Sequence, residues 1–149
     1  MKTACQKTLN ILRVVAHTDW GADKKTLLLL YRALVRSKLD YGCVVYGSAR
    51  ESLLKMLDPI HHQGLCLGAF RTSPVYSLYA ESGEPPLANR RLKLSLSYYT
   101  KLYSEMNNPA YENVFDRRLA EEFEKNPTCI PPFGIRIGPQ AQKAEIDLV

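Results

Sequence analysis

Basic side chains at helical spacing are the residues of this chain whose types and positions point to a chemistry. Guanidinium and ammonium groups one to two helical turns apart match the spacing at which successive phosphates of a nucleic acid are neutralised. Lys25, Arg32 and Arg36 fall within one narrow arc of a helix. The alternative for each of them is simple solvation of a helix surface. The candidate nucleic-acid-binding residues are Lys24, Lys25, Arg32, Arg36, Lys38, Arg71, Arg90, Arg91 and Lys93.

Hydroxyl and aromatic side chains add to this candidate surface. Arg71 follows Phe70 and precedes the hydroxyls of Thr72 and Ser73, where it could add a phosphate contact near a helix N-terminus. Tyrosine rings can stack on bases, but those in this chain lie at apolar spacings, for which core packing is the favoured interpretation. They are Tyr31, Tyr41, Tyr46, Tyr98 and Tyr99.

The charge of the chain is concentrated in its first two thirds. Residues 1–101 carry 15 Lys and Arg against 7 Asp and Glu, a net charge of +8, whereas residues 102–149 carry 5 against 8, a net charge of −3. A basic region indicates an anionic partner, and a phosphate backbone is the commonest one for a domain of this size. Charge alone still favours a merely solvated surface.

The residues that could act in catalysis do not form a recognisable site. His61 and His62 are neighbours and would point about 100° apart on a helix, so they cannot both face one site. Polymerase chemistry needs paired aspartates that hold two cations, and this chain has no Asp-Asp pair. Its aspartates are isolated ones that suit helix caps or a charged surface, such as Asp19, Asp23 and Asp40. We therefore expect no catalytic residue and no enzymatic activity.

The cysteines indicate free thiols and no metal site. Cys5, Cys43, Cys66 and Cys129 are scattered singly, without the close ligand pairs that a zinc site requires. Isolated thiols are typical of a reducing compartment. We expect no metal and no cofactor.

Composition and hydropathy are those of an intracellular globular protein. The chain has 149 residues, of which 46% are hydrophobic, enough for a core. Its longest apolar run, 27–31, is far shorter than the roughly 20 residues of a membrane span. The N-terminal apolar stretch is interrupted by Asn10 and Arg13 and lacks a cleavage site, so it is no signal peptide. We expect a cytoplasmic or nuclear protein that is neither secreted nor bound to a membrane.

Hydrophobic periodicity predicts an all-α fold, a small bundle of about five to six helices with an irregular C-terminal tail. Domain 1–125 would hold the helices, and 126–149, punctuated by Pro and Gly, would be a linker or tail. Asp23 is the expected N-cap of the second helix, and Gly83 the expected end of the fourth. The expected helices are 3–16, 24–46, 51–69 with a kink or restart at Pro59, 74–82, 87–106 and 110–125.

The second helix, 24–46, is expected to bury one stripe and to present its basic row on the opposite side, with a kink or an early end at Gly42. The predicted buried stripe is Leu27, Leu30, Leu34, Tyr41 and Val45. Helix 87–106 has two candidate stripes, between which the pattern does not decide. One is Leu87, Leu94, Tyr98 and Leu102, and the other is Leu92, Leu96, Tyr99 and Tyr103.

Short runs, in order over the first two thirds of the chain, carry a resemblance to a known family. They are 9–14 (LNILRV), 17–23 (HTDWGAD), 28–47 (LLLYRALVRSKLDYGCVVYG), 49–50 (AR), 57–65 (LDPIHHQGL), 68–74 (GAFRTSP) and 84–87 (EPPL). In order and spacing they resemble the segment that follows the catalytic palm in reverse transcriptases of jockey-like non-LTR retrotransposons. The chain departs from that family by having two residues fewer between Gly64 and Gly68.

The resemblance implies a helical thumb and connection without the polymerase's own chemistry, which lies in the palm upstream of this segment. The family carries out RNA-templated DNA synthesis, and its thumb grips the template–primer duplex through backbone contacts. We therefore expect weak, sequence-independent binding to duplex nucleic acid, and the palm as a further candidate partner. The alternative is a helical protein-interaction module that does not bind nucleic acid. The sequence indicates no oligomeric state.

Overall fold

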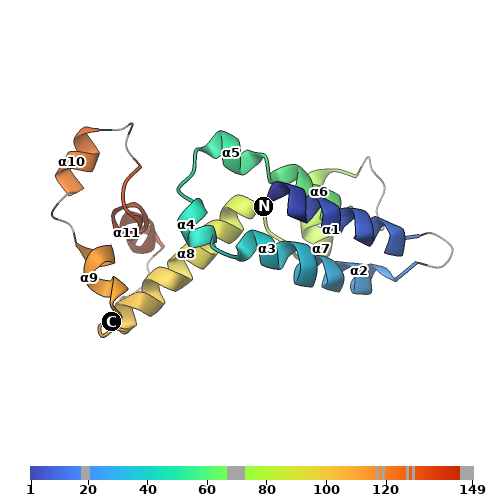
Figure 1. Cartoon of the computed structure of the whole chain (residues 1–149), viewed down its shortest axis with the longest axis horizontal. Helices are drawn as coiled ribbons and strands as arrows, with labels where there is room; N and C mark the ends of the chain where they lie inside the picture. Colours follow the sequence, from blue (N-terminus) through green and yellow to red (C-terminus); the bar gives the residue numbers. More distant parts are fainter. Residues whose placement is uncertain are drawn as a thin grey trace. The chain divides into compact units, whose positions relative to one another are not determined.

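The chain is all-α, as predicted. The computed structural model describes residues 1–17, 21–66, 73–116, 118, 120–126, 128 and 130–144, and these residues contain no strand (Figure 1). The chain forms two compact units. Unit 1 comprises Met1–Gly42 and Ala49–Arg90, and unit 2 comprises Cys43–Ser48 and Arg91–Val149. This division does not coincide with the expected boundary after Lys125.

Helices account for most of each unit. Unit 1 contains α1 (Lys2–Val15), α2 (Lys24–Tyr31), the π-helix η1 (Arg32–Arg36), α3 (Ser37–Asp40), α5 (Glu51–Lys55), α6 (Asp58–Leu65) and α7 (Val75–Ser82). Helix α8 (Leu87–Ser104) begins in unit 1, and its larger part belongs to unit 2. Unit 2 also contains α4 (Cys43–Tyr46), α9 (Ala110–Phe115), α10 (Ala120–Lys125) and α11 (Phe133–Lys143).

Local sequence signals explain where several helices begin and end. The Asp23 carboxylate accepts hydrogen bonds from the backbone N–H groups of Lys25 at 3.1 Å and Thr26 at 3.4 Å, which confirms it as the N-cap of α2. Pro59 lies in the first turn of α6, where its missing N–H costs nothing. Gly83 follows α7 with φ 65°, a left-handed conformation that stops the helix.

The expected single helix over 24–46 is wrong. The chain forms a π-helical turn at Arg32–Arg36, leaves the helix after Asp40, and resumes at Cys43. Gly42, with φ 67°, provides the break that was expected there. The wider i→i+5 turn of a π-helix shifts the angular position of every later residue relative to the α-helical pattern.

The predicted buried stripe of this segment is also wrong in part. Leu34, Tyr41 and Val45 are 41%, 86% and 77% exposed. The side chains that face the core are instead four apart along the chain: Leu27, Tyr31, Val35 and Leu39. The leucines of the segment predict the wrong buried face. The observed buried face is the one that carries the Tyr31 ring.

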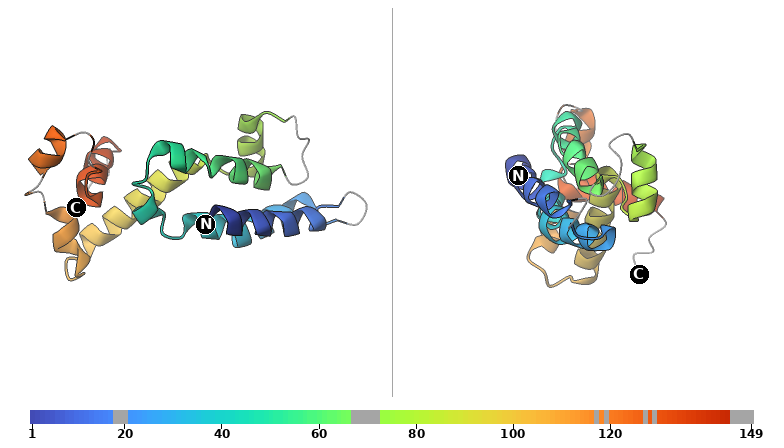
Figure 2. Two further views of the ribbon diagram at one scale, coloured as in Figure 1. Left: turned by 45° about the horizontal axis from the view of Figure 1, so that its top comes forward. Right: turned by 90° about the vertical axis from the view of Figure 1, so that its right-hand side faces the viewer.

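The core of unit 1 lies between α1, α2, η1 and α6, which pack side by side (Figures 1 and 2). Gly64 of α6 allows the closest approach, because a Cβ there would stand 2.3 Å from two carbons of the Tyr31 ring. The buried apolar residues of the unit are Cys5, Leu9, Leu12, Leu27, Tyr31, Val35, Leu39, Leu57, Ile60, Leu65, Leu78 and Leu87.

Unit 2 has its own small core around an aromatic cluster. Tyr99, Ile137 and Ala141 are buried, and the partly buried side chains packed on them are Leu96, Val114, Phe115 and Phe133. Neither predicted stripe of 87–106 is buried as a whole. Leu102 of one and Tyr99 of the other are buried, whereas Tyr98 of the first and Leu92 of the second are exposed. Helix α9 packs on α11.

Helix α11 was not predicted, because the expectation for 126–149 was an extended linker or tail. Pro139 and two glycines predict a break in helical structure, although Phe133, Ile137 and Ala141 stand four apart as on one helical face. Pro132 precedes the helix and Pro139 is accommodated inside it. The expected helix over 110–125 is likewise divided into α9 and α10. Positions 145–149 lie outside the described residues.

We predict that Gly64→Ala destabilises the protein. Helix propensity alone would make this substitution stabilising by about 1 kcal/mol. The new methyl group would instead overlap the fully buried Tyr31 ring, which should lower the free energy of unfolding by roughly 1–3 kcal/mol. Urea unfolding followed by circular dichroism measures the sign directly, and a gain in stability would contradict this packing.

Candidate nucleic-acid interface

The predicted basic row is held by an internal carboxylate. Arg32 Nε donates to Glu84 Oε1 at 2.6 Å, and Arg36 Nη1 donates to both Glu84 oxygens, at 2.6 and 2.9 Å. The Glu84 side chain is only 2% exposed, whereas those of Arg32 and Arg36 are 38% and 23% exposed. The two guanidinium groups therefore lie at the edge of the unit with their inner sides already neutralised.

The turn after α7 places Glu84 in this position. Gly83 reverses the chain, and the Glu84 backbone N–H then donates to Ser82 Oγ at 3.2 Å. Arg32 Nη2 also donates to the Ser82 carbonyl at 3.0 Å. Burial of the Glu84 carboxyl opposes its ionisation, but the hydrogen bonds from Arg36 and Arg32 outweigh burial and leave its pKa below the ordinary value.

A second carboxylate extends the network. Arg90 Nη2 and Nε donate to the two Asp40 oxygens at 2.8 and 3.3 Å. Arg36 Nε lies 3.8 Å from Asp40 Oδ2, so Arg36 stands between both carboxylates. Within this cluster three guanidinium groups face two carboxylates, which leaves one net positive charge.

The remaining sequence-predicted residues are not brought together. Lys24 Nζ pairs with Glu81 at 2.5 Å on the surface, and Lys38 Nζ donates to Thr8 Oγ1 at 2.8 Å. Lys25 is exposed, and its side chain has no partner among the described residues. Arg91 and Lys93 belong to unit 2. Arg71 lies outside the described residues, as do positions 67–68 at the end of the stretch between Gly64 and Gly68.

His61 and His62 make separate hydrogen bonds within unit 1, and His61 is almost fully buried. His61 Nε2 lies 3.1 Å from the Pro85 carbonyl and donates to it, so Nδ1 accepts from the Tyr31 hydroxyl. Burial lowers the pKa of His61. His62 Nε2 is bonded separately to the Tyr79 hydroxyl at 2.7 Å. No signal in the sequence indicated the Tyr31–His61 pair, because its members are thirty residues apart.

The tyrosines divide between core and surface. Tyr31 and Tyr99 are buried, so their rings are not presented on the outer surface of their units. Tyr41 and Tyr98 are exposed. Within the described part of the chain, no group of His, Cys, Asp and Glu side chains could hold a metal ion.

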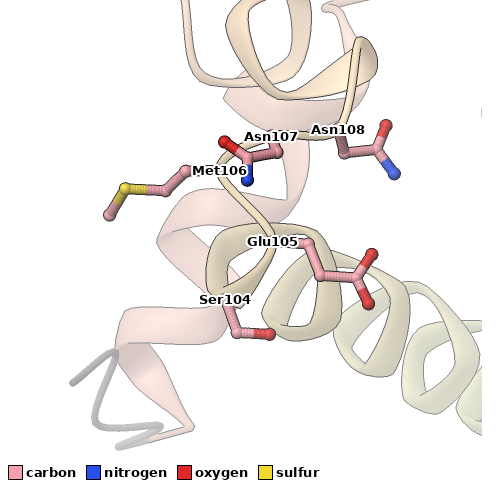
Figure 3. A pocket seen from close by; sticks show the side chains of 5 residues that line it. All are labelled: Ser104, Glu105, Met106, Asn107 and Asn108. Carbon is pink, nitrogen blue, oxygen red and sulfur yellow. The ribbon is translucent and has the colours of Figure 1, made fainter.

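A hollow of about 670 Å³ beside the loop between α8 and α9 does not form a site. Its lining consists of the consecutive residues Ser104 to Asn108. In Figure 3, Met106 points to the opposite side from Glu105 and Asn108, so the polar groups do not converge. The hollow follows the curvature of one loop.

No protein-family model matches the sequence, and no curated protein or solved structure shows significant similarity to it. None of the described helices combines the length and the hydropathy that crossing a membrane requires.

We predict that Glu84→Gln lowers the free energy of unfolding at pH 7 by about 3 kcal/mol, because two partly buried guanidinium groups lose their carboxylate. The pKa of Glu84 is lower in the folded state than in the unfolded state. Its contribution to the free energy of unfolding is therefore fully present above the unfolded-state pKa and is lost as the pH falls through the folded-state pKa. In urea unfolding, the difference between parent and variant should therefore narrow below about pH 4.

Glu81→Gln is the matched control. It removes a carboxylate that also pairs with a basic side chain, but the Lys24–Glu81 pair is largely exposed, with side chains 54% and 61% accessible. Its stability should barely change. Equal effects of the two substitutions, or a Glu84 effect that persists undiminished at low pH, would contradict the role assigned to Glu84.

Proposed function

We propose that unit 1 is a helical module that grips duplex nucleic acid through the sugar–phosphate backbone, as a non-catalytic, thumb-like fragment of a non-LTR retrotransposon reverse transcriptase. Three things support this proposal: the ordered sequence runs described above, the all-α fold, and the distribution of charge. An intracellular location, cytoplasmic or nuclear, follows from such a role. A catalytic palm would be its natural protein partner.

The charge distribution is the observation that carries the proposal. Unit 1 contains 12 Lys and Arg against 7 Asp and Glu, a difference of +5, whereas unit 2 contains 8 against 8. The whole net charge of the chain therefore belongs to unit 1. Because Glu84 and Asp40 neutralise most of the arginine cluster, phosphate contacts depend on cations that remain outside it, of which Lys25 is the best candidate. On an α-helical wheel Lys25 shares an arc with Arg32 and Arg36, whose side chains are 38% and 23% exposed.

We predict weak duplex binding that is insensitive to sequence and falls steeply with salt, because it comes from counterion release. Lys25→Gln should reduce affinity for an RNA–DNA hybrid duplex. It should also flatten the salt slope, the slope of the logarithm of the binding constant against the logarithm of the salt concentration, by about one unit. Fluorescence anisotropy over a range of salt concentrations measures both quantities. This single substitution avoids the folding cost of replacing Arg32 or Arg36, which would leave Glu84 buried with one partner fewer.

Lys101→Gln serves as the control, since it removes the same charge from an exposed position in unit 2. It should leave the salt slope unchanged. If Lys25→Gln and the parent give identical slopes, Lys25 is a solvated surface residue and the assigned contact is wrong.

A second expected outcome concerns catalysis. The chain lacks the paired aspartates that would hold two metal ions. The purified protein should therefore incorporate no nucleotide on any template–primer with Mg²⁺ or Mn²⁺. A primer-extension assay tests this, with a mock purification as the control for contaminating polymerases. Extension above that control would overturn the non-catalytic assignment.

A protein-interaction module remains the second candidate, because unit 1 exposes several large apolar side chains. Among them are Ile11, Val14, Leu29, Leu53, Met56 and Tyr76. Isolated apolar side chains are common on protein surfaces, which is why we place this reading second. Absence of a salt-dependent affinity for duplexes would favour the protein-interaction module over the proposed nucleic-acid grip.

A further inference from the structure

Unit 2 contains a cavity that the proposed backbone contacts do not use. Its volume is about 300 Å³, at the lower end of the range for small-molecule sites, which suits a single ring system better than a larger ligand. It lies between α8, α9 and α11. Its lining consists of Tyr99, Tyr103, Tyr111, Val114, Phe115, Gly134, Gly138 and Gln142.

The aromatic part of the wall is held in place by its own packing. Phe115 stands at the centre of three ring contacts, with centroid distances of 5.0 Å to Tyr99, 5.5 Å to Tyr103 and 4.6 Å to Tyr111. Rings braced against one another in this way cost little conformational entropy when a planar ligand stacks on them.

The opposite wall is formed partly by backbone. Gly134 lies so close to α9 that a Cβ there would stand 1.7 Å from the Val114 carbonyl oxygen. Gly138, one turn further along α11, is buried and also lines the cavity. At these two positions α11 borders the cavity with backbone alone.

The lining residues include polar groups that the described part of the chain does not use. The hydroxyls of Tyr103 and Tyr111 and the amide of Gln142 make no hydrogen bond to another residue of the described part. A hydroxyl and a carboxamide each both donate and accept. Tyr103 and Tyr111 are half-buried, and Gln142 is exposed and stands at the rim.

We infer that this cavity binds a single nucleobase. A planar heteroaromatic ring with donors and acceptors along its edge satisfies both features of the lining, since every base has a face that stacks on aromatic side chains. The choice of a nucleobase over other heteroaromatic rings rests on the proposed nucleic-acid function. The same chemistry is offered by a free nucleoside and by an unpaired base at the end of a duplex.

The test compares three ligands of the full-length protein by calorimetry or anisotropy: adenosine, a blunt hybrid duplex, and the same duplex with a one-nucleotide 3′ adenosine overhang. We expect measurable adenosine binding and a preference of roughly 5- to 100-fold for the overhang over the blunt end. Adenosine binding without that preference would assign the cavity to free nucleosides only and overturn its role with strands. Absence of both would overturn the inference as a whole.

Variants locate the effect. Tyr103→Leu should abolish the overhang preference while leaving blunt-duplex affinity unchanged, and Tyr76→Leu, the same change at an exposed position of unit 1, should have no effect. Gln142→Leu, at an exposed position, should weaken adenosine binding without affecting folding, so the test survives if Tyr103→Leu fails to fold. Unchanged adenosine binding in Gln142→Leu would place the nucleoside elsewhere. Failure of the blunt duplex to bind, with adenosine binding intact, would count against the proposed function and not against this site.

Discussion

The carboxylate of Glu84 is the constraint on which the arrangement of unit 1 depends. It lies almost fully buried between Arg32 and Arg36, and it connects the π-helical turn of the second helical segment to the chain entering α8. A buried carboxylate is tolerated only when its lone pairs are satisfied, and here hydrogen bonds from two guanidinium groups satisfy them. The turn at Gly83 and the backbone bond to Ser82 position it. Next to it in sequence, the Pro85 carbonyl accepts from His61, so the same loop also positions the buried histidine.

This constraint changes the meaning of the basic row. On a helical wheel, Lys25, Arg32 and Arg36 form one cationic face, yet two of the three are already engaged by an internal carboxylate. A phosphate approaching Arg32 or Arg36 must compete with Glu84 at short range or bind only the outer edges of the guanidinium groups. Net charge at long range is unaffected by this pairing, whereas the contacts available at close range are reduced. Under the proposed function, such a surface would give weak and sequence-independent binding.

Structural features that depend on a few neighbouring residues could be predicted from the sequence, whereas contacts between distant segments could not. The Asp23 cap, the Gly83 stop, the Pro59 restart and the all-α class all depend on local chemistry. The burial of Tyr31 depends on His61 and Gly64, which lie on another helix, so periodicity chose the leucine stripe in its place. The Arg32–Glu84 pair could likewise not be predicted, because its members are fifty-two residues apart. Of the candidate site, the residue types and the shared arc of the row were accessible in advance, but not which charges are neutralised.

The missed helix α11 shows why glycine and proline mislead when they are scored without their surroundings. Gly64 and Gly134 both occur in helices, where glycine costs about 1 kcal/mol relative to alanine. In each case the cost is offset by close approach, of Gly64 to the Tyr31 ring and of Gly134 to the Val114 carbonyl. The Pro and Gly content of 126–149 predicts an irregular tail, because it does not reveal such contacts. The stretch nevertheless includes Phe133, Ile137 and Ala141, which are spaced four apart as on one face of a helix. The glycines of α11 that predict a break in the helix also border the cavity in unit 2, where they contribute backbone and no side chain.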